Sequence, residues 1–122
     1  MTSTEPIRVF IADDRARTRH ALRSTLRAHR RFDVVGEAAD GEEALRQIEH
    51  LRPAVVILDI RMPGVDGIAT TQRIKERWPW IRVIAHSFAV ESSEEILRAG
   101  ADAFVPKGGR ADELVAAVLS LD

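Results

Sequence analysis

The segment Ala54-Val-Val-Ile-Leu58 is apolar throughout and runs directly into the carboxylate of Asp59. An unbroken apolar run of this length is typical of a strand that is buried on both faces, as in a parallel sheet covered by helices on both sides. Other short runs are also apolar or β-branched, and they predict strands at 7–12, 34–38, 81–85 and 103–105. The fold is therefore built around a sheet of short strands.

Segments with the hydrophobic spacing of amphipathic helices separate these strands. The spacing predicts helices at 15–31, from a cap at Asp40 to about 51, 68–78, 93–99 and 113–121. Asp40 and Ser92 each precede a glutamate by three positions, which is the pattern of a capping box. Strands that alternate with helices favour right-handed crossovers. We therefore expect an α/β fold with a doubly wound, five-stranded parallel sheet and five helices.

Length and composition limit the possible functions. The chain has 122 residues, so we expect a single domain over 1–122 with its core at about 7–121. It has no cysteine, which excludes disulfides, thiolate metal sites and cysteine catalysis. It has neither a membrane-length apolar run nor a signal peptide at its start, so we expect a cytoplasmic protein without a membrane partner. The net charge of -1 gives no indication of nucleic-acid binding.

Polar residues follow four of the predicted strands, where doubly wound sheets bind their ligands. They are Asp13 and Asp14 after the first strand, Asp59 after the third, Ser87 after the fourth and Lys107 after the fifth. Taken singly, the first two aspartates could cap the next helix, and the lysine could be a surface residue. Together they predict a site where Mg²⁺ and a lysine offset phosphoryl charge and one carboxylate attacks phosphorus.

The chain resembles the receiver domains of bacterial two-component response regulators over about 7–121. The matching stretches are Val9-Phe-Ile-Ala-Asp-Asp14, Ile57-Leu-Asp-Ile-Arg-Met-Pro-Gly64 with Asp66-Gly67, Val83-Ile84 leading to Ser87, and Gly100-Ala-Asp-Ala-Phe-Val-Pro-Lys107. The resemblance implies a flavodoxin-like fold with strand order 2-1-3-4-5. The run 58–64 is similar to receivers that precede helix-turn-helix domains, so any DNA contact would come through an output domain absent from this chain.

The resemblance also implies a role for each site residue. Asp59 is the phosphoacceptor for a sensor histidine kinase, and Lys107 pairs with the phosphoryl group. The implied Mg²⁺ ligands are Asp13, Asp14, Asp59 and the backbone carbonyl of Arg61. Ser87 and Phe104 are the switch residues, and they alter the face of the fourth helix, fifth strand and fifth helix. The resemblance implies that this face forms a homodimer, which tightens on phosphorylation.

Several positions depart from the family pattern. Phe88 stands where a small residue is usual, and we expect it either at the rim of the site, controlling access, or in the core. The fourth helix is short, and His86 replaces an aliphatic residue. We expect His86 to be at least half-buried, to face away from Ser87 and to have a local partner. The resemblance implies a cis peptide before Pro106, although the family's usual order is lysine and then proline.

The first predicted helix carries many arginines and no acid. They are Arg15, Arg17, Arg19, Arg23, Arg27, Arg30 and Arg31. One interpretation is a solvated face; the other, implied by the resemblance, is a docking surface for the kinase.

Three alternatives to the phosphoacceptor remain. The first is a receiver-like interaction module that acts without phosphorylation, although such a module need not keep its acidic set. A haloacid-dehalogenase-like phosphatase needs an acid two residues after its nucleophile, where this chain has Arg61. A flavodoxin-type flavin carrier needs a phosphate-binding loop after the first strand, where Asp13 and Asp14 would repel phosphate.

Overall fold

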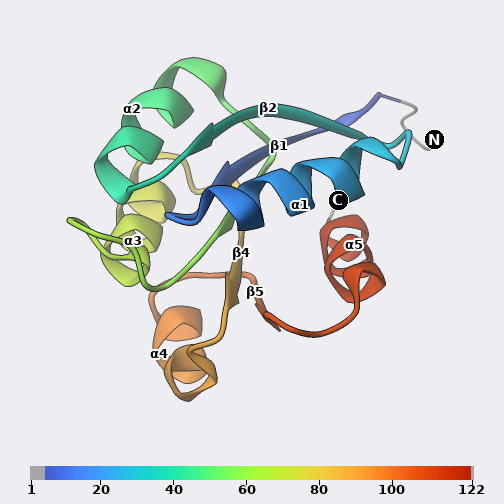
Figure 1. Cartoon of the computed structure of the whole chain (residues 1–122). Helices are drawn as coiled ribbons and strands as arrows, with labels where there is room; N and C mark the ends of the chain where they lie inside the picture. The colour runs from blue at the N-terminus through green and yellow to red at the C-terminus, as the bar shows by residue number, and fades with distance from the viewer. Residues whose placement is uncertain (1–4, 122) are drawn as a thin grey trace.

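The computed structural model describes residues 5–121, which form a five-stranded parallel sheet in the order β2-β1-β3-β4-β5 (Figure 1). The strands are β1 (Ile7–Ala12), β2 (Phe32–Ala38), β3 (Val55–Leu58), β4 (Arg82–Ser87) and β5 (Ala103–Pro106). The predicted fold class and strand order are confirmed. The apolar run that suggested the fold forms β3, which lies between β1 and β4 and is buried at every position.

Helices cover both faces of the sheet. They are α1 (Ala16–Arg27), α2 (Gly41–Leu51), α3 (Gly67–Arg77), α4 (Ser93–Arg98) and α5 (Ala111–Ser120), with a 3₁₀ turn at Val90–Ser92 before α4. One core packs beneath α2, α3 and α4, and a second beneath α1 and α5. Strand β1 contributes Phe10 to the first core and Val9 and Ile11 to the second, because successive side chains of a strand point to opposite faces. None of the helices within 5–121 is both long and apolar enough to span a membrane.

Helix α5 begins at Ala111, two residues before the predicted start, and α1 and the cap of α4 also differ from the sequence prediction. Helix α1 ends at Arg27 rather than Arg31, because the buried Phe32 already pairs with Ile7 as the first residue of β2. Helix α4 begins at Ser93 with Ser92 at its N-cap position, as predicted, but the predicted capping box does not form because the Ser92 side chain makes no capping bond. The Asp40 cap is confirmed, and its Oδ1 accepts a hydrogen bond from the Glu43 amide at 2.8 Å.

The segment around Pro106 also corrects an expectation. Every peptide bond between described residues is trans, so the cis peptide before Pro106 is not found. Strand β5 instead continues through this proline, which pairs with Ser87 of β4. The next residue, Lys107, donates its amide to the Ser87 carbonyl at 3.0 Å. The chain thus carries Lys107 to the carboxyl edge of the sheet.

Candidate functional site

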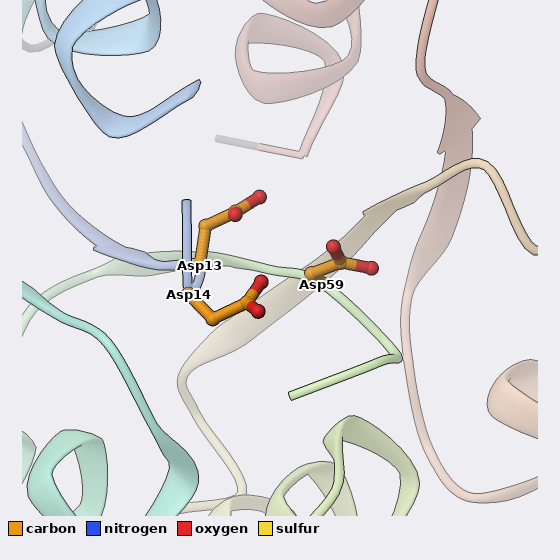
Figure 2. A group of neighbouring side chains, drawn as sticks. All are labelled: Asp13, Asp14 and Asp59. Atoms are coloured by element: carbon orange, nitrogen blue, oxygen red, sulfur yellow. The ribbon is translucent and has the colours of Figure 1, made fainter. Parts of the chain in front are cut away.

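Three carboxylates meet at the carboxyl edge of the sheet, as the sequence predicted. Asp13 and Asp14 occupy adjacent positions after β1, and Asp59 lies on the neighbouring segment after β3 (Figure 2). One oxygen from each of them lies within 4.8 Å of the other two. Asp13 and Asp59 are buried and Asp14 is exposed.

Backbone hydrogen bonds fix the two buried carboxylates. The amide of Asp59 donates to the Ala12 carbonyl, and the amide of Asp13 donates to the Ala38 carbonyl, each at 3.0 Å. Neither Asp13 nor Asp14 is the N-cap of α1, since that position belongs to Arg15 and has no side-chain cap. Asp13 Oδ1 instead accepts from the Arg15 amide at 2.9 Å. The capping explanation for these aspartates therefore does not hold.

Lys107 reaches into the acidic cluster and is not a surface residue. Its Nζ lies 2.7 Å from Asp13 Oδ2 and 2.7 Å from Asp59 Oδ2, and only 5% of its side chain is exposed. Burial by itself would raise the pKa of Asp59, but hydrogen bonds from Lys107 and Ser87 outweigh it and lower that pKa below the usual aspartate value. Burial likewise opposes the charge of Lys107, yet Asp13 and Asp59 raise the pKa of its ammonium. The lysine and Asp59 therefore remain charged at neutral pH.

The donor set at this edge suits a hard divalent cation. Carboxylate oxygens are the ligands that Mg²⁺ prefers, and the ion usually takes one or two carboxylates and keeps several waters. One exposed and two buried carboxylates meet that requirement. The amide of Arg61 donates to Asp59 Oδ1 at 3.2 Å, so the backbone after Asp59 also lies beside the site.

The two predicted switch residues lie on neighbouring strands. Ser87 is buried at the end of β4, and its Oγ accepts from the Ala89 amide at 3.1 Å. Phe104 in β5 pairs with Ala85 of β4, is half-buried and packs against the core beneath α2, α3 and α4. The hydroxyl therefore adjoins the acidic cluster, and the aromatic ring lies further back along β5.

Phe88 lies at the rim of the site and not in the core. The residue is 61% exposed and helps to line a pocket of about 270 Å³ that Asp14, Asp59, Ser87 and Lys107 also line. The Phe88 ring centroid is 5.7 Å from Lys107 Nζ. Of the two expected placements, the structure has the first, at the rim of the pocket that Asp59 lines.

His86 faces the opposite side of the sheet from Ser87, as strand alternation predicts. It lines a groove of about 310 Å³ between α1 and α5, whereas Ser87 lines the acidic pocket. Its side chain is half-buried, but its Nδ1 has no hydrogen-bond partner among the described residues, so the expected local partner is not found at that atom. Burial lowers the pKa of His86, and Lys107 adds to this effect.

Two contacts at the site were not predicted. Arg61 Nη2 donates to Glu91 Oε1 at 2.5 Å, and both residues line the acidic pocket. Arg19 of α1 donates to the Asp13 carbonyl at 2.7 Å. The only sequence signal for the second contact was the excess of arginine on the first helix.

Comparison with known proteins shows which family the chain resembles. The response regulator receiver domain model matches residues 9–119. Response regulator GacA from Pseudomonas protegens is 34% identical over 114 residues, which cover 92% of this chain and 54% of GacA. A protein-glutamate methylesterase/protein-glutamine glutaminase from Alkalilimnicola ehrlichii is 38% identical over 104 residues, 83% of this chain and 27% of that protein. The chain thus spans about half the length of GacA and about a quarter of the length of the methylesterase/glutaminase.

A solved structure agrees with this result. The response regulator domain of Thermotoga maritima CheB superposes with a TM-score of 0.89 at 32% identity, and the match covers 96% of each chain. The family model, the relatives and the shared fold lead to one conclusion: the chain belongs to the response regulator receiver domain family.

Proposed function

We propose that the chain is the phosphoacceptor switch of a two-component system, with Asp59 as the residue that receives the phosphoryl group. The observation that carries the proposal is the arrangement at Asp59. Its carboxylate is buried, ionised and held by Lys107 and the Arg61 amide, and two further carboxylates adjoin it. Fixed positive and hydrogen-bonding groups around a carboxylate nucleophile are what transfer of a phosphoryl group requires.

In the proposed reaction, an oxygen of Asp59 attacks phosphorus in line with the leaving group. The new bond joins this oxygen to phosphorus, the bond from phosphorus to the imidazole nitrogen of the kinase breaks, and that nitrogen keeps the electron pair. Lys107 then exchanges its bond to Asp59 for one to a phosphoryl oxygen. Asp13, Asp14, Asp59 and the Arg61 carbonyl would hold Mg²⁺, and the ion would neutralise charge on the phosphoryl oxygens.

The proposed switch follows from the two residues behind the site. Ser87 exchanges its hydrogen bond to Asp59 for one in which its hydroxyl donates to a phosphoryl oxygen. Phe104 then turns towards the space that this movement opens. The change would reach the face formed by α4, β5 and α5, where α4 has only six residues and is easily remodelled. We further propose that this face forms a phosphorylation-dependent homodimer or acts on an output domain.

For the sensor kinase we propose docking on α1 and the adjoining groove. The buried Leu22 and Leu114 form the groove floor, and the exposed Arg17 and Arg110 stand at its edges. Apolar side chains flanked by carboxylates on the kinase would complement this surface. Phe88 and Lys107 line the same groove, so a partner seated there would lie next to the entrance to Asp59.

The alternative, a module that acts without phosphorylation, has one observation in its favour. Phe88 stands at the pocket rim, where it could keep donors out. Against it, the inward-facing Lys107 and the depressed pKa of Asp59 keep the acceptor ready to react.

The test is incubation with Mg²⁺ and acetyl phosphate, followed by intact-mass measurement. We expect a gain of one phosphoryl group in the native chain and none in Asp59→Asn. Asp33→Asn, which changes an exposed aspartate of β2, is the matched control and should be phosphorylated normally. An unmodified native protein, under conditions where a known receiver is phosphorylated, would favour the phosphorylation-independent module.

A further inference from the structure

An arginine from α1 holds the backbone of the loop that carries Asp13 and Asp14. Arg19 Nη1 donates to the Asp13 carbonyl at 2.7 Å, and its Nε donates to Glu37 Oε1 at 3.1 Å. The side chain of Arg19 is 18% exposed. One guanidinium thus joins the acidic loop, α1 and the end of β2.

Glu37, which binds Arg19, is itself held in place by hydrogen bonds. Glu37 lies in β2, where it pairs with Ile11, and its carbonyl accepts from Gln47 Nε2 of α2 at 3.1 Å. The amide of Asp13 is bound to the next residue of β2, Ala38. Both polar backbone groups of Asp13 are therefore tied to the same strand end, one directly and one through Arg19.

Arg23, one turn further along α1, provides a natural comparison. It pairs with the other carboxylate oxygen of Glu37 and contacts His20 Nδ1 at 3.2 Å. The two arginines therefore share one carboxylate on one helix, but within the described chain the contact with the Asp13 carbonyl belongs to Arg19. An effect that replacement of Arg19 has and replacement of Arg23 lacks must therefore act through the Asp13 carbonyl.

We propose that Arg19 is a positioning residue of the metal site, which acts by fixing the peptide between Asp13 and Asp14. Asp14 has an exposed side chain, so its place beside the other carboxylates depends on its backbone. The planar guanidinium can bond a carbonyl and a carboxylate at once, which a lysine ammonium does not reproduce. The inference rests on the proposed function, in which these carboxylates hold Mg²⁺.

A positioning role and a purely electrostatic role for Arg19 predict opposite changes in Mg²⁺ affinity when this residue is replaced. A nearby cation repels Mg²⁺, so charge alone predicts that Arg19→Gln binds the ion more tightly. Loss of a group that orients metal ligands predicts weaker binding, typically by about 10-fold or more. The sign of the change in affinity therefore distinguishes the two explanations.

The experiment is calorimetric titration of Mg²⁺ into the native chain, Arg19→Gln, Arg19→Lys and Arg23→Gln, below the melting temperature of every variant. We expect about 10-fold weaker binding in both Arg19 variants and no weakening in Arg23→Gln. Unchanged or tighter binding in Arg19→Gln, or equal weakening in Arg23→Gln, would overturn the proposal. Failure of the native chain to bind Mg²⁺ would instead reject the metal assignment itself.

Amide hydrogen exchange without metal supplies a second readout. The Arg15 amide is bonded to Asp13 Oδ1 and so reports on the order of this loop. We expect its exchange to speed up in Arg19→Gln and to remain unchanged in Arg23→Gln. Equal exchange in these two variants would show that Arg19 does not hold the loop.

Discussion

The loss of stability when Phe88 is replaced by alanine shows whether this residue lies at the rim of the site or in the core. Because the residue is 61% exposed, about two fifths of its surface is buried. Full burial of a phenylalanine contributes about 1.5–3 kcal/mol, so this fraction corresponds to about 1 kcal/mol. A phenylalanine in the core would cost about 3–5 kcal/mol on the same replacement. We therefore expect a loss of about 1 kcal/mol in the free energy of unfolding.

The same variant tests whether Phe88 limits access to Asp59. In-line transfer needs an open approach to the acceptor, and hydrolysis of the acyl phosphate needs an aligned water. We expect Phe88→Ala to speed both phosphorylation by acetyl phosphate and dephosphorylation, with unchanged Mg²⁺ affinity because Phe88 supplies no ligand. Phe88→Leu, which keeps an apolar side chain at the rim, should change both rates less.

Urea denaturation and phosphorylation kinetics on the same preparations provide the assay. A stability loss of about 3 kcal/mol or more, together with unchanged rates per folded molecule, would refute the access role. So would a faster phosphorylation that leaves dephosphorylation unaltered, because one obstruction should affect donor and water alike.

Five further predictions concern metal binding, stability, pH dependence, backbone packing and assembly. Asp14→Ala should abolish Mg²⁺ binding in a calorimetric titration and leave the melting temperature unlowered, because its side chain is exposed; retained affinity would reject its role as a ligand. Lys107→Met leaves two buried carboxylates without their cation and should cost about 3–5 kcal/mol at pH 7. In the native chain the lowered pKa of Asp59 stabilises the fold at neutral pH, and this stabilisation is lost as the pH falls below about 4. Urea denaturation across pH should therefore show that acidification lowers the free energy of unfolding less in Lys107→Met than in the native chain. Gly67→Ala should destabilise the chain by about 1–3 kcal/mol and slow phosphorylation, because its Cβ would lie 2.2 Å from the Asp59 carbonyl oxygen; a normal rate and stability would contradict this. Sedimentation should show a dimer that tightens with an acyl-phosphate mimic, and an unchanged mass would count against the dimer.

The sequence was sufficient to predict the fold and the meeting of the charged side chains at one edge of the sheet. The unbroken apolar run at 54–58 predicted a strand buried on both faces, and the rule that ligands bind at strand ends then brought Asp13, Asp59 and Lys107 together. Both inferences depend on backbone periodicity and topology, which are properties of the whole chain. They do not depend on the conformation of any one side chain.

The details that sequence reasoning missed depend on tertiary contacts. Helix α1 is shorter than its local pattern predicts because Phe32 is needed in β2. Whether Phe88 lies in the core or at the rim depends on how the chain turns after β4, which no local pattern specifies. The contact of Arg19 with the Asp13 carbonyl joins positions on a loop and a helix, and its sequence signal is one arginine among seven.

Reduction of the phosphorylated chain with borohydride shows whether Asp59 carries the phosphoryl group. Borohydride converts an aspartyl phosphate to homoserine, and peptide mass mapping locates the converted residue. We expect homoserine at position 59 after treatment with Mg²⁺ and acetyl phosphate, and none when the donor is omitted. Homoserine at Asp13 or Asp14, or donor-dependent phosphorylation without conversion at position 59, would contradict the assignment to Asp59.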